Sequence, residues 1–376
     1  MPLARIMQHA ESRILRTSNR DKEGPFVRLG VTLSAWDTAD LTANLALAEE
    51  ADRLGYAVCW AAEAYGFDAA TILATVAART ARMDVGSAVF QIPARTPAMT
   101  AMTAVTLDAL SHGRLRLGLG VSGPQVSEGW YGVRFGKPLH RTREYVEVVR
   151  TVLDRERLDR TGEYFTLPLP DGPGKALRLS VRPVRDRIPL YLAAVGPANL
   201  ALAGEIADGW LGVFVAPDHL PESLTHIRTG RTRGGRDDTE QFDVVACVPA
   251  VVGDDVAACA DPVRHYAALY LGGMGSRDKN FYNALAVRMG YEKEAARVQD
   301  LYLARQHRDA AAAVPLAFVD DTSLLGPAER IAARLRRYAE AGVSTLSVLP
   351  FGATVEQRIT TLQTMAGALV ASGVGE

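Results

Sequence analysis

The residues most suggestive of chemistry follow a short apolar run, where Gly118, Gly120 and Gly123 have the spacing G-x-G-x-x-G. In a dinucleotide-binding fold, glycines at this spacing let the backbone approach a pyrophosphate at the start of a helix. Here Pro124 follows at once, and no strand ending in an acidic residue lies about twenty residues further on. The pattern therefore argues against a nicotinamide dinucleotide site. It does indicate that the backbone lies close to a ligand or to a packed neighbour.

A second glycine-containing turn, LAAVGPAN at residues 192–199, joins an apolar run to a helical pattern. The helix is expected to begin at Pro197, so that the backbone N–H groups around Ala194, Val195 and Gly196 point outward at its N-terminus. Such a position receives a phosphate readily. An ordinary strand-to-helix turn with no ligand has the same spacing and remains the alternative.

The remaining candidates are polar and aromatic side chains at or near predicted strand ends: Glu63, Gln91 and Ser122, and the aromatic Trp36, Tyr131 and Phe214. Glu63 is a candidate proton donor or acceptor, and capping of the following helix is its alternative role. Gln91 and Tyr131 are candidates for the substrate side, whereas Trp36 and Phe214 would supply aromatic walls.

Metal and hydrolase chemistry find no support in the sequence. The seven histidines form no H-E-x-x-H motif, and the three cysteines form no C-x-x-C motif. The sequence also contains no G-x-S-x-G elbow and no P-loop. We therefore expect no metal site.

The elements that must position these residues alternate between apolar runs and helical patterns. Eight runs are predicted strands: residues 27–34, 57–62, 83–90, 115–120, 188–193, 210–215, 244–252 and 344–349. Repeated strand–helix units predict an α/β protein, a (β/α)8 TIM barrel with its active site at the C-terminal strand ends. Two doubly wound domains are the alternative.

Two stretches interrupt the alternation. Residues 163–184 contain several prolines and glycines, which predicts a loop excursion, and residues 253–325 are rich in tyrosine and too long for a simple loop. The latter predicts a helical insertion in the C-terminal third that helps to shape the substrate entrance. We expect residues 1–26 to form an N-terminal arm and residues 27–376 a single barrel domain.

Composition restricts the classes of partner. The 376 residues are 48% hydrophobic and 23% charged, with a formal net charge of −1, which is typical of a soluble globular protein. This balance predicts binding to neither nucleic acid nor membrane, and no apolar run reaches the roughly 18 residues of a membrane span. The three scattered cysteines predict a cytoplasmic protein without a disulfide framework.

Several phrases, taken in order, are similar to the luciferase-like flavin and deazaflavin oxidoreductases, specifically the branch that uses coenzyme F420. They are WAAEAYGFDA (60–69), QIPARTPA (91–98), TLDALSHGR (106–114), LGLGVSGPQVSEGWYG (117–132), KPLHRTREY (137–145), GPANLALAGEIADGW (196–210) and LYLGGMG (269–275). The resemblance extends from Leu29 to about Leu369.

The resemblance implies a TIM barrel with insertions, often dimeric, that holds the deazaflavin at the C-terminal strand ends. It implies a non-prolyl cis peptide between Ala88 and Val89, behind the central ring of the coenzyme. It also implies a phosphate at Val195, Gly196 and Pro197, in agreement with the argument from the helix N-terminus. Val121, Ser122 and Gly123 would flank the ring and the ribityl chain.

Two departures from the family pattern limit what can be transferred. Well-studied relatives have an Asp-His pair where this chain has Glu63-Ala64, and a sugar-phosphate dehydrogenase relative has a glutamate where this chain has Gly123. We therefore predict an F420-dependent oxidoreductase that acts by hydride transfer on a small organic substrate, with Glu63 as the candidate for proton transfer. The alternatives are an FMN-dependent monooxygenase and a non-catalytic cofactor-binding protein.

Overall fold

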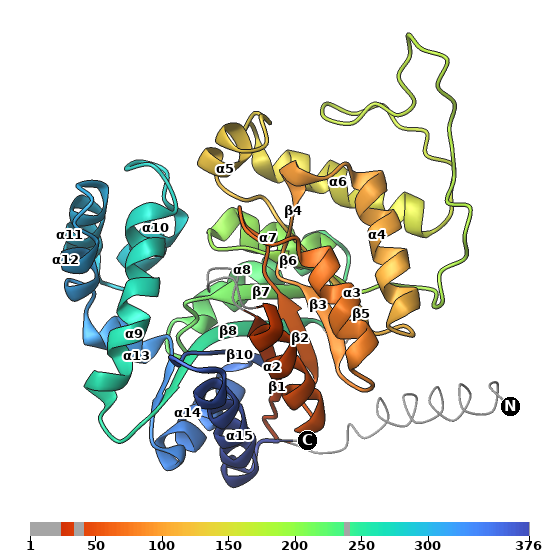
Figure 1. Cartoon of the computed structure of the whole chain (residues 1–376). Helices are drawn as coiled ribbons and strands as arrows, with labels where there is room; N and C mark the ends of the chain where they lie inside the picture. The colour runs from red at the N-terminus through yellow and green to blue at the C-terminus, as the bar shows by residue number, and fades with distance from the viewer. Residues whose placement is uncertain (1–23, 34–40, 237–240, 376) are drawn as a thin grey trace, which may run out of the picture.

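The fold is a closed barrel of parallel strands, seen in a computed structural model that describes residues 24–33, 41–236 and 241–375 (Figure 1). Within these residues, eight strand positions follow one another around the barrel in the order β10-β1-β2-β3-β5-β6-β7-β8, and β10 pairs with β8 to close it. The strands are β1 (Arg28–Leu33), β2 (Val58–Ala61), β3 (Asp84–Ser87) with its continuation β4 (Phe90–Gln91), β5 (Leu115–Gly120), β6 (Leu190–Ala193), β7 (Gly209–Val213), β8 (Asp243–Val252) and β10 (Thr345–Pro350). The predicted TIM barrel is confirmed.

One strand was not predicted. β9 (Leu324–Gly326) has three residues and pairs with the end of β8, from Ala250 to Val252. A three-residue strand is too short to show an alternating pattern, and it directly follows a helical stretch. It extends the sheet beside the barrel without changing its closure.

The helices that cover the barrel begin and end where local signals place them. They are α2 (Leu41–Arg53), α3 (Ala69–Arg79), α4 (Pro97–Leu110), α5 (Pro124–Gly129), α6 (Pro138–Leu153), α7 (Pro197–Ile206), α8 (Leu220–Arg233), α14 (Ala328–Ala341) and α15 (Val355–Ser372). Asp68 and Thr96 cap α3 and α4 by accepting hydrogen bonds from Thr71 N and Met99 N. No helix in the described ranges combines the length and apolar character that a membrane span requires.

The tyrosine-rich stretch forms helices, as predicted. Between β8 and β9 the chain makes α9 (Val256–Ala268), a π-helical turn η2 (Leu269–Gly273), α10 (Phe281–Arg288), α11 (Glu292–Leu303), α12 (His307–Ala312) and α13 (Leu316–Asp321). These helices have an apolar core of their own around Phe318. In Figure 1, α10, α11 and α12 stand on the opposite side of the molecule from α3 and α4. The predicted excursion, residues 163–184, projects from the barrel, and Leu167 within it forms an antiparallel bridge with Arg160 just before it.

The N-terminal end of the barrel is closed by a buried ion cluster. Arg116 Nε contacts Asp84 Oδ2 at 3.0 Å, and Arg116 Nη1 contacts Asp243 Oδ2 at 2.8 Å. Tyr191 donates to Asp243 at 3.0 Å, and Thr345 does so at 2.8 Å. Burial alone would raise the pKa of Asp243, but Arg116 keeps that pKa below its usual range. Because this end is filled, a ligand must enter from the C-terminal end.

Candidate functional site

A cavity of about 580 Å³ lies at the C-terminal ends of the strands. This volume is in the range of small-molecule and cofactor sites, about 300–1,000 Å³. Many of the predicted site residues line it: Glu63, Ala88, Val89, Gln91, Val121, Ser122, Gly123, Ala194, Val195, Gly196 and Pro197. The barrel thus brings together segments that follow four different strand positions.

A bulge in the third strand forms one wall. Gly86 is opposite Arg116 and Phe90 is opposite Leu119, so the β3–β4 chain has one residue more than β5 between these pairs. Ser87 Oγ restores the missing ladder contacts by donating to Gly118 O at 2.8 Å and accepting from Gly118 N at 2.9 Å. The peptide bond between Ala88 and Val89 in the bulge is cis, as the resemblance predicted.

The G-x-G-x-x-G glycines meet this bulge. A Cβ atom on Gly118 would lie 1.9 Å from Ser87 O, and one on Gly120 would lie 2.4 Å from Val89 Cγ2. A Cβ on Gly123 would reach only Gln125 Oε1, at 3.6 Å, which is an ordinary contact. Of the two alternatives left by the sequence, the packed neighbour explains the first two glycines.

Glu63 lies beside the bulge as half of a buried ion pair. Its side chain is 5% exposed, and Arg95 binds its two oxygens at 2.5 and 2.7 Å. Gln91 N donates to Oε2 at 3.2 Å and Ala69 N donates to Oε1 at 3.4 Å. Both oxygens are therefore engaged by protein N–H groups. This arrangement favours the structural alternative, in which Glu63 positions Gln91 and the start of α3, over proton transfer.

A hydrogen-bonded chain crosses the cavity mouth. Gln91 Nε2 donates to Ser122 Oγ at 3.0 Å, and Tyr131 donates its hydroxyl to Gln91 Oε1 at 2.8 Å. Ser122 has a φ of 61°, in the left-handed region, which turns the loop after β5. Gln91 and Ser122 line the cavity, whereas Tyr131 lies one layer further out and fixes the orientation of the Gln91 amide.

The aromatic wall differs from the expectation. Phe214 is 3% exposed and packs behind the cavity, with its ring centroid 5.4–5.5 Å from those of Tyr266, Tyr270 and Phe318. Its φ of 50° turns the chain directly after β7, so that the ring enters the core of the helical insertion. The rings that line the cavity in front of it are those of Tyr266, Tyr270 and Tyr282. Trp36, the other predicted wall residue, lies outside the described residues.

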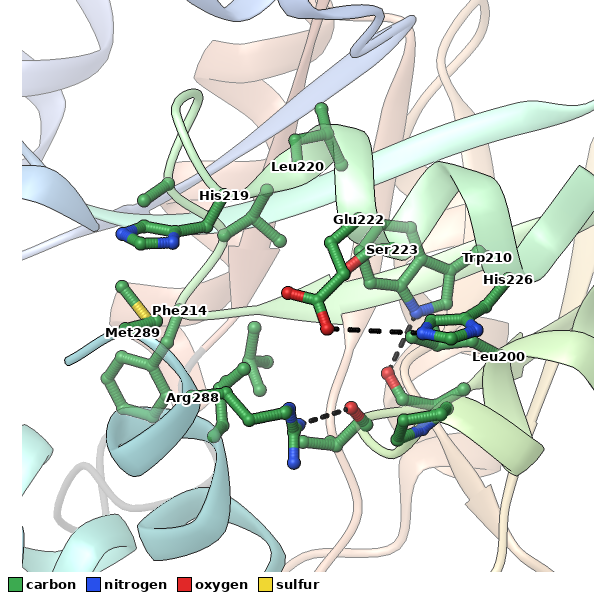
Figure 2. Close-up of a pocket in the computed structure, with 17 residues that line it drawn as sticks. Leu200, Trp210, Phe214, His219, Leu220, Glu222, Ser223, His226, Arg288 and Met289 are labelled. Atoms are coloured by element: carbon green, nitrogen blue, oxygen red, sulfur yellow. Dashed lines mark hydrogen bonds and ion pairs between the residues drawn. The ribbon is translucent and has the colours of Figure 1, made fainter. Parts of the chain in front are cut away.

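Two side chains hold the carbonyl groups of the turn before α7 by hydrogen bonds (Figure 2). Trp210 Nε1 donates to Ala194 O at 2.8 Å, and Arg288 Nη2 donates to Val195 O at 2.9 Å, across a small pocket of about 40 Å³. In a trans peptide the C=O and N–H groups point in opposite directions. These contacts therefore direct the N–H groups of Val195 and Gly196 away from the small pocket.

The space in front of the turn suits an anion. A Cβ on Gly196 would meet no atom within 4 Å, and Gly196 is the N-cap of the ten-residue helix α7. The free N–H groups and the helix dipole both favour negative charge there. Sequence reasoning found this turn but not Arg288, which is 93 residues from its acceptor and shows no local signal.

Comparison with known proteins gives four findings. The family model described as luciferase-like monooxygenase matches residues 24–345. A Mycobacterium tuberculosis protein, provisionally named as a coenzyme F420-dependent oxidoreductase, is 40% identical over 338 residues, which cover 88% of this chain and 97% of that protein. The structure of a coenzyme F420-dependent tetrahydromethanopterin reductase from Methanopyrus kandleri has a TM-score of 0.77 at 22% identity, covering 92% and 99% of the two chains. The FMN complex of the oxygenating constituent of 3,6-diketocamphane monooxygenase, from Pseudomonas putida, has a TM-score of 0.64 at 16% identity, covering 92% and 98%.

Proposed function

This chain belongs to the luciferase-like monooxygenase family, and we propose that it is a coenzyme F420-dependent oxidoreductase that transfers a hydride between the coenzyme and a small organic substrate. The observation that carries the choice of coenzyme is the 40% identity to a relative named for F420, over 97% of that relative. The M. kandleri reductase, also named for F420, has the same fold over nearly the whole chain.

The cavity fits the parts of such a coenzyme. Its phosphate would accept hydrogen bonds from the N–H groups of Val195 and Gly196, where a Cβ atom at Gly196 would meet nothing within 4 Å. Its ring would lie against Ala88 and Val89 in the bulge, beside the loop that contains Ser122. The bound coenzyme supplies a ring carbon that donates or accepts a hydride, and the protein positions the reactants and excludes water.

FMN is the second candidate, because an FMN-bound monooxygenase shares the fold and also carries a phosphate. Fluorescence titration of the purified protein with each cofactor separates the two proposals. We expect saturable binding of F420 at lower concentration than FMN, and no oxygen uptake with the reduced coenzyme. Tight binding of FMN together with oxygen uptake by its reduced form would refute the F420 assignment.

Replacing Gly196 by aspartate is expected to weaken F420 binding about 10–100-fold, because a carboxylate would compete with the phosphate for the same N–H groups. Aspartate is a favourable N-cap residue, so that the thermal midpoint should stay the same or rise. The matched control is Gly196→Asn, an uncharged N-cap residue of similar size. If both variants bind F420 like the wild type, the phosphate does not occupy this turn.

A further inference from the structure

If the coenzyme ring lies against the bulge, as the proposed function requires, groups that act on the substrate belong on the opposite wall of the cavity. In the closed order of eight strand positions, β8 lies four positions from β3 in either direction. Cys247 on β8 and the helix α9 that follows it therefore face the bulge across the barrel. A substrate between the coenzyme ring and this wall would contact side chains from α9, η2 and α10.

These elements present Tyr266, Tyr270 and Tyr282, which we call the tyrosine trio, to the cavity. The ring centroids of Tyr266 and Tyr270 are 4.7 Å apart, and those of Tyr270 and Tyr282 are 4.8 Å apart. Tyr266 also hydrogen-bonds to Tyr270, and Phe214 packs behind all three rings. The trio is therefore a packed unit with its phenol groups in contact.

The backbone that carries the trio is specifically stabilised. Tyr270 belongs to the π-helical turn η2, a rare conformation that is frequently found at functional sites. Asn280 Nδ2 donates to the carbonyl oxygens of Tyr270 and Leu271, each at 3.0 Å, and Asn283 Nδ2 donates to that of Leu271 at 3.1 Å. Two side-chain amides thus satisfy carbonyl groups that a regular helix would pair internally.

The chemistry of the cavity favours hydrogen-bond donation to a neutral oxygen. Burial raises the pKa of Tyr266 and of Tyr282 above the ordinary phenol value, so both hydroxyls stay protonated at neutral pH. Among the described lining residues, Glu63 is the charged side chain, and Arg95 already neutralises it. A substrate with a formal charge would find no counter-charge in this part of the lining.

We propose that the tyrosine trio binds the oxygen of an uncharged carbonyl substrate and donates the proton that accompanies hydride transfer. The carbonyl carbon receives the hydride from the reduced coenzyme as the C=O π bond breaks. The carbonyl oxygen takes a phenol proton to give the alcohol. The resulting phenolate recovers its proton from solvent.

The test uses 4-dimethylaminocinnamaldehyde, whose absorption band moves to longer wavelength when its carbonyl oxygen accepts a hydrogen bond. We expect the shift with the coenzyme-free wild-type protein, and a reduced shift with about fivefold weaker binding in at least one of Tyr266→Phe, Tyr270→Phe and Tyr282→Phe. With reduced F420 present, the rate constant for reduction of the aldehyde should fall about 100-fold in that variant. The dissociation constant of F420 should not change, because the coenzyme lies against the opposite wall.

The matched control is Tyr291→Phe, which removes a hydroxyl from the same helical insertion where it donates to Asp321 at 3.2 Å. This variant should keep the wild-type band shift. Absence of a shift in the wild type, or an equal shift in all three trio variants, would overturn the proposal. Failure of F420 to bind the wild type would instead refute the proposed function, while the band shift of the coenzyme-free protein still decides the role of the trio.

Discussion

Replacing Gly118 by alanine is expected to lower the free energy of unfolding by about 3 kcal/mol, the upper part of the range for overpacking a core. The added methyl group would lie 1.9 Å from Ser87 O, a backbone atom that cannot rotate away. Ser87 Oγ also bonds to both the N–H and the C=O of Gly118, so that any shift of β5 breaks these two bonds. The bulge would move, and we expect F420 affinity to fall together with stability.

The control comes from the same motif. Gly123→Ala should change stability little, because its Cβ would make only an ordinary contact at 3.6 Å and Gly123 has a φ of −118°. A dinucleotide fingerprint would make all three glycines important for the ligand. The difference between the two variants in urea unfolding therefore distinguishes packing from phosphate binding. Equal stability of Gly118→Ala and Gly123→Ala would contradict the packing explanation.

Local signals were sufficient for most of the barrel. The apolar runs and the helix caps Asp68 and Thr96 each act over only a few neighbouring residues. The repeat of strand and helix then leaves a parallel barrel as the simplest way to bury every strand. The cis peptide at Ala88–Val89 is different, because only the family resemblance predicted it.

What the sequence did not show depends on partners that are distant along the chain. Arg95 reaches Glu63 across 32 positions, and Arg288 reaches Val195 across 93. No periodicity encodes such a pair, so Glu63 looked like a free acid at a strand end. The expected position of the Phe214 ring in the cavity wall was missed for a related reason. Strand alternation predicts the direction of a side chain only while the strand continues, and β7 ends at Val213.

The tyrosine-rich stretch illustrates how far composition can go. The stretch was expected to help shape the substrate entrance, and Tyr266, Tyr270 and Tyr282 from it line the cavity. Tyr291 and Tyr302 belong to the same stretch but pack elsewhere, against Phe318 and His307. The sequence does not distinguish the two groups, whereas their positions in the structure do.

Replacing Arg95 by methionine is expected to lower the free energy of unfolding by about 3–5 kcal/mol, because it leaves the Glu63 carboxylate buried without its counter-charge. Methionine keeps apolar contact with the Phe90 ring, over which the guanidinium carbon lies at 4.6 Å, so the loss of charge dominates. The double variant with Glu63→Gln should recover part of this loss, since no buried charge then remains. Glu63 also accepts a hydrogen bond from Gln91 N in the cavity wall. We therefore expect F420 affinity to fall and to recover together with stability across the series.

Arg79→Met supplies the comparison for this series. Arg79 pairs with Glu49 at 3.3 Å, but both side chains are about half exposed, and such a pair contributes about 0.5 kcal/mol. Urea unfolding of Arg95→Met, Arg79→Met and the double variant Arg95→Met with Glu63→Gln, beside the wild type, measures the difference. If Arg95→Met costs no more than Arg79→Met, or if the double variant is less stable than Arg95→Met alone, then Glu63 is not held as a buried anion. Glu63 would then regain its place as a proton-transfer candidate at the cavity wall.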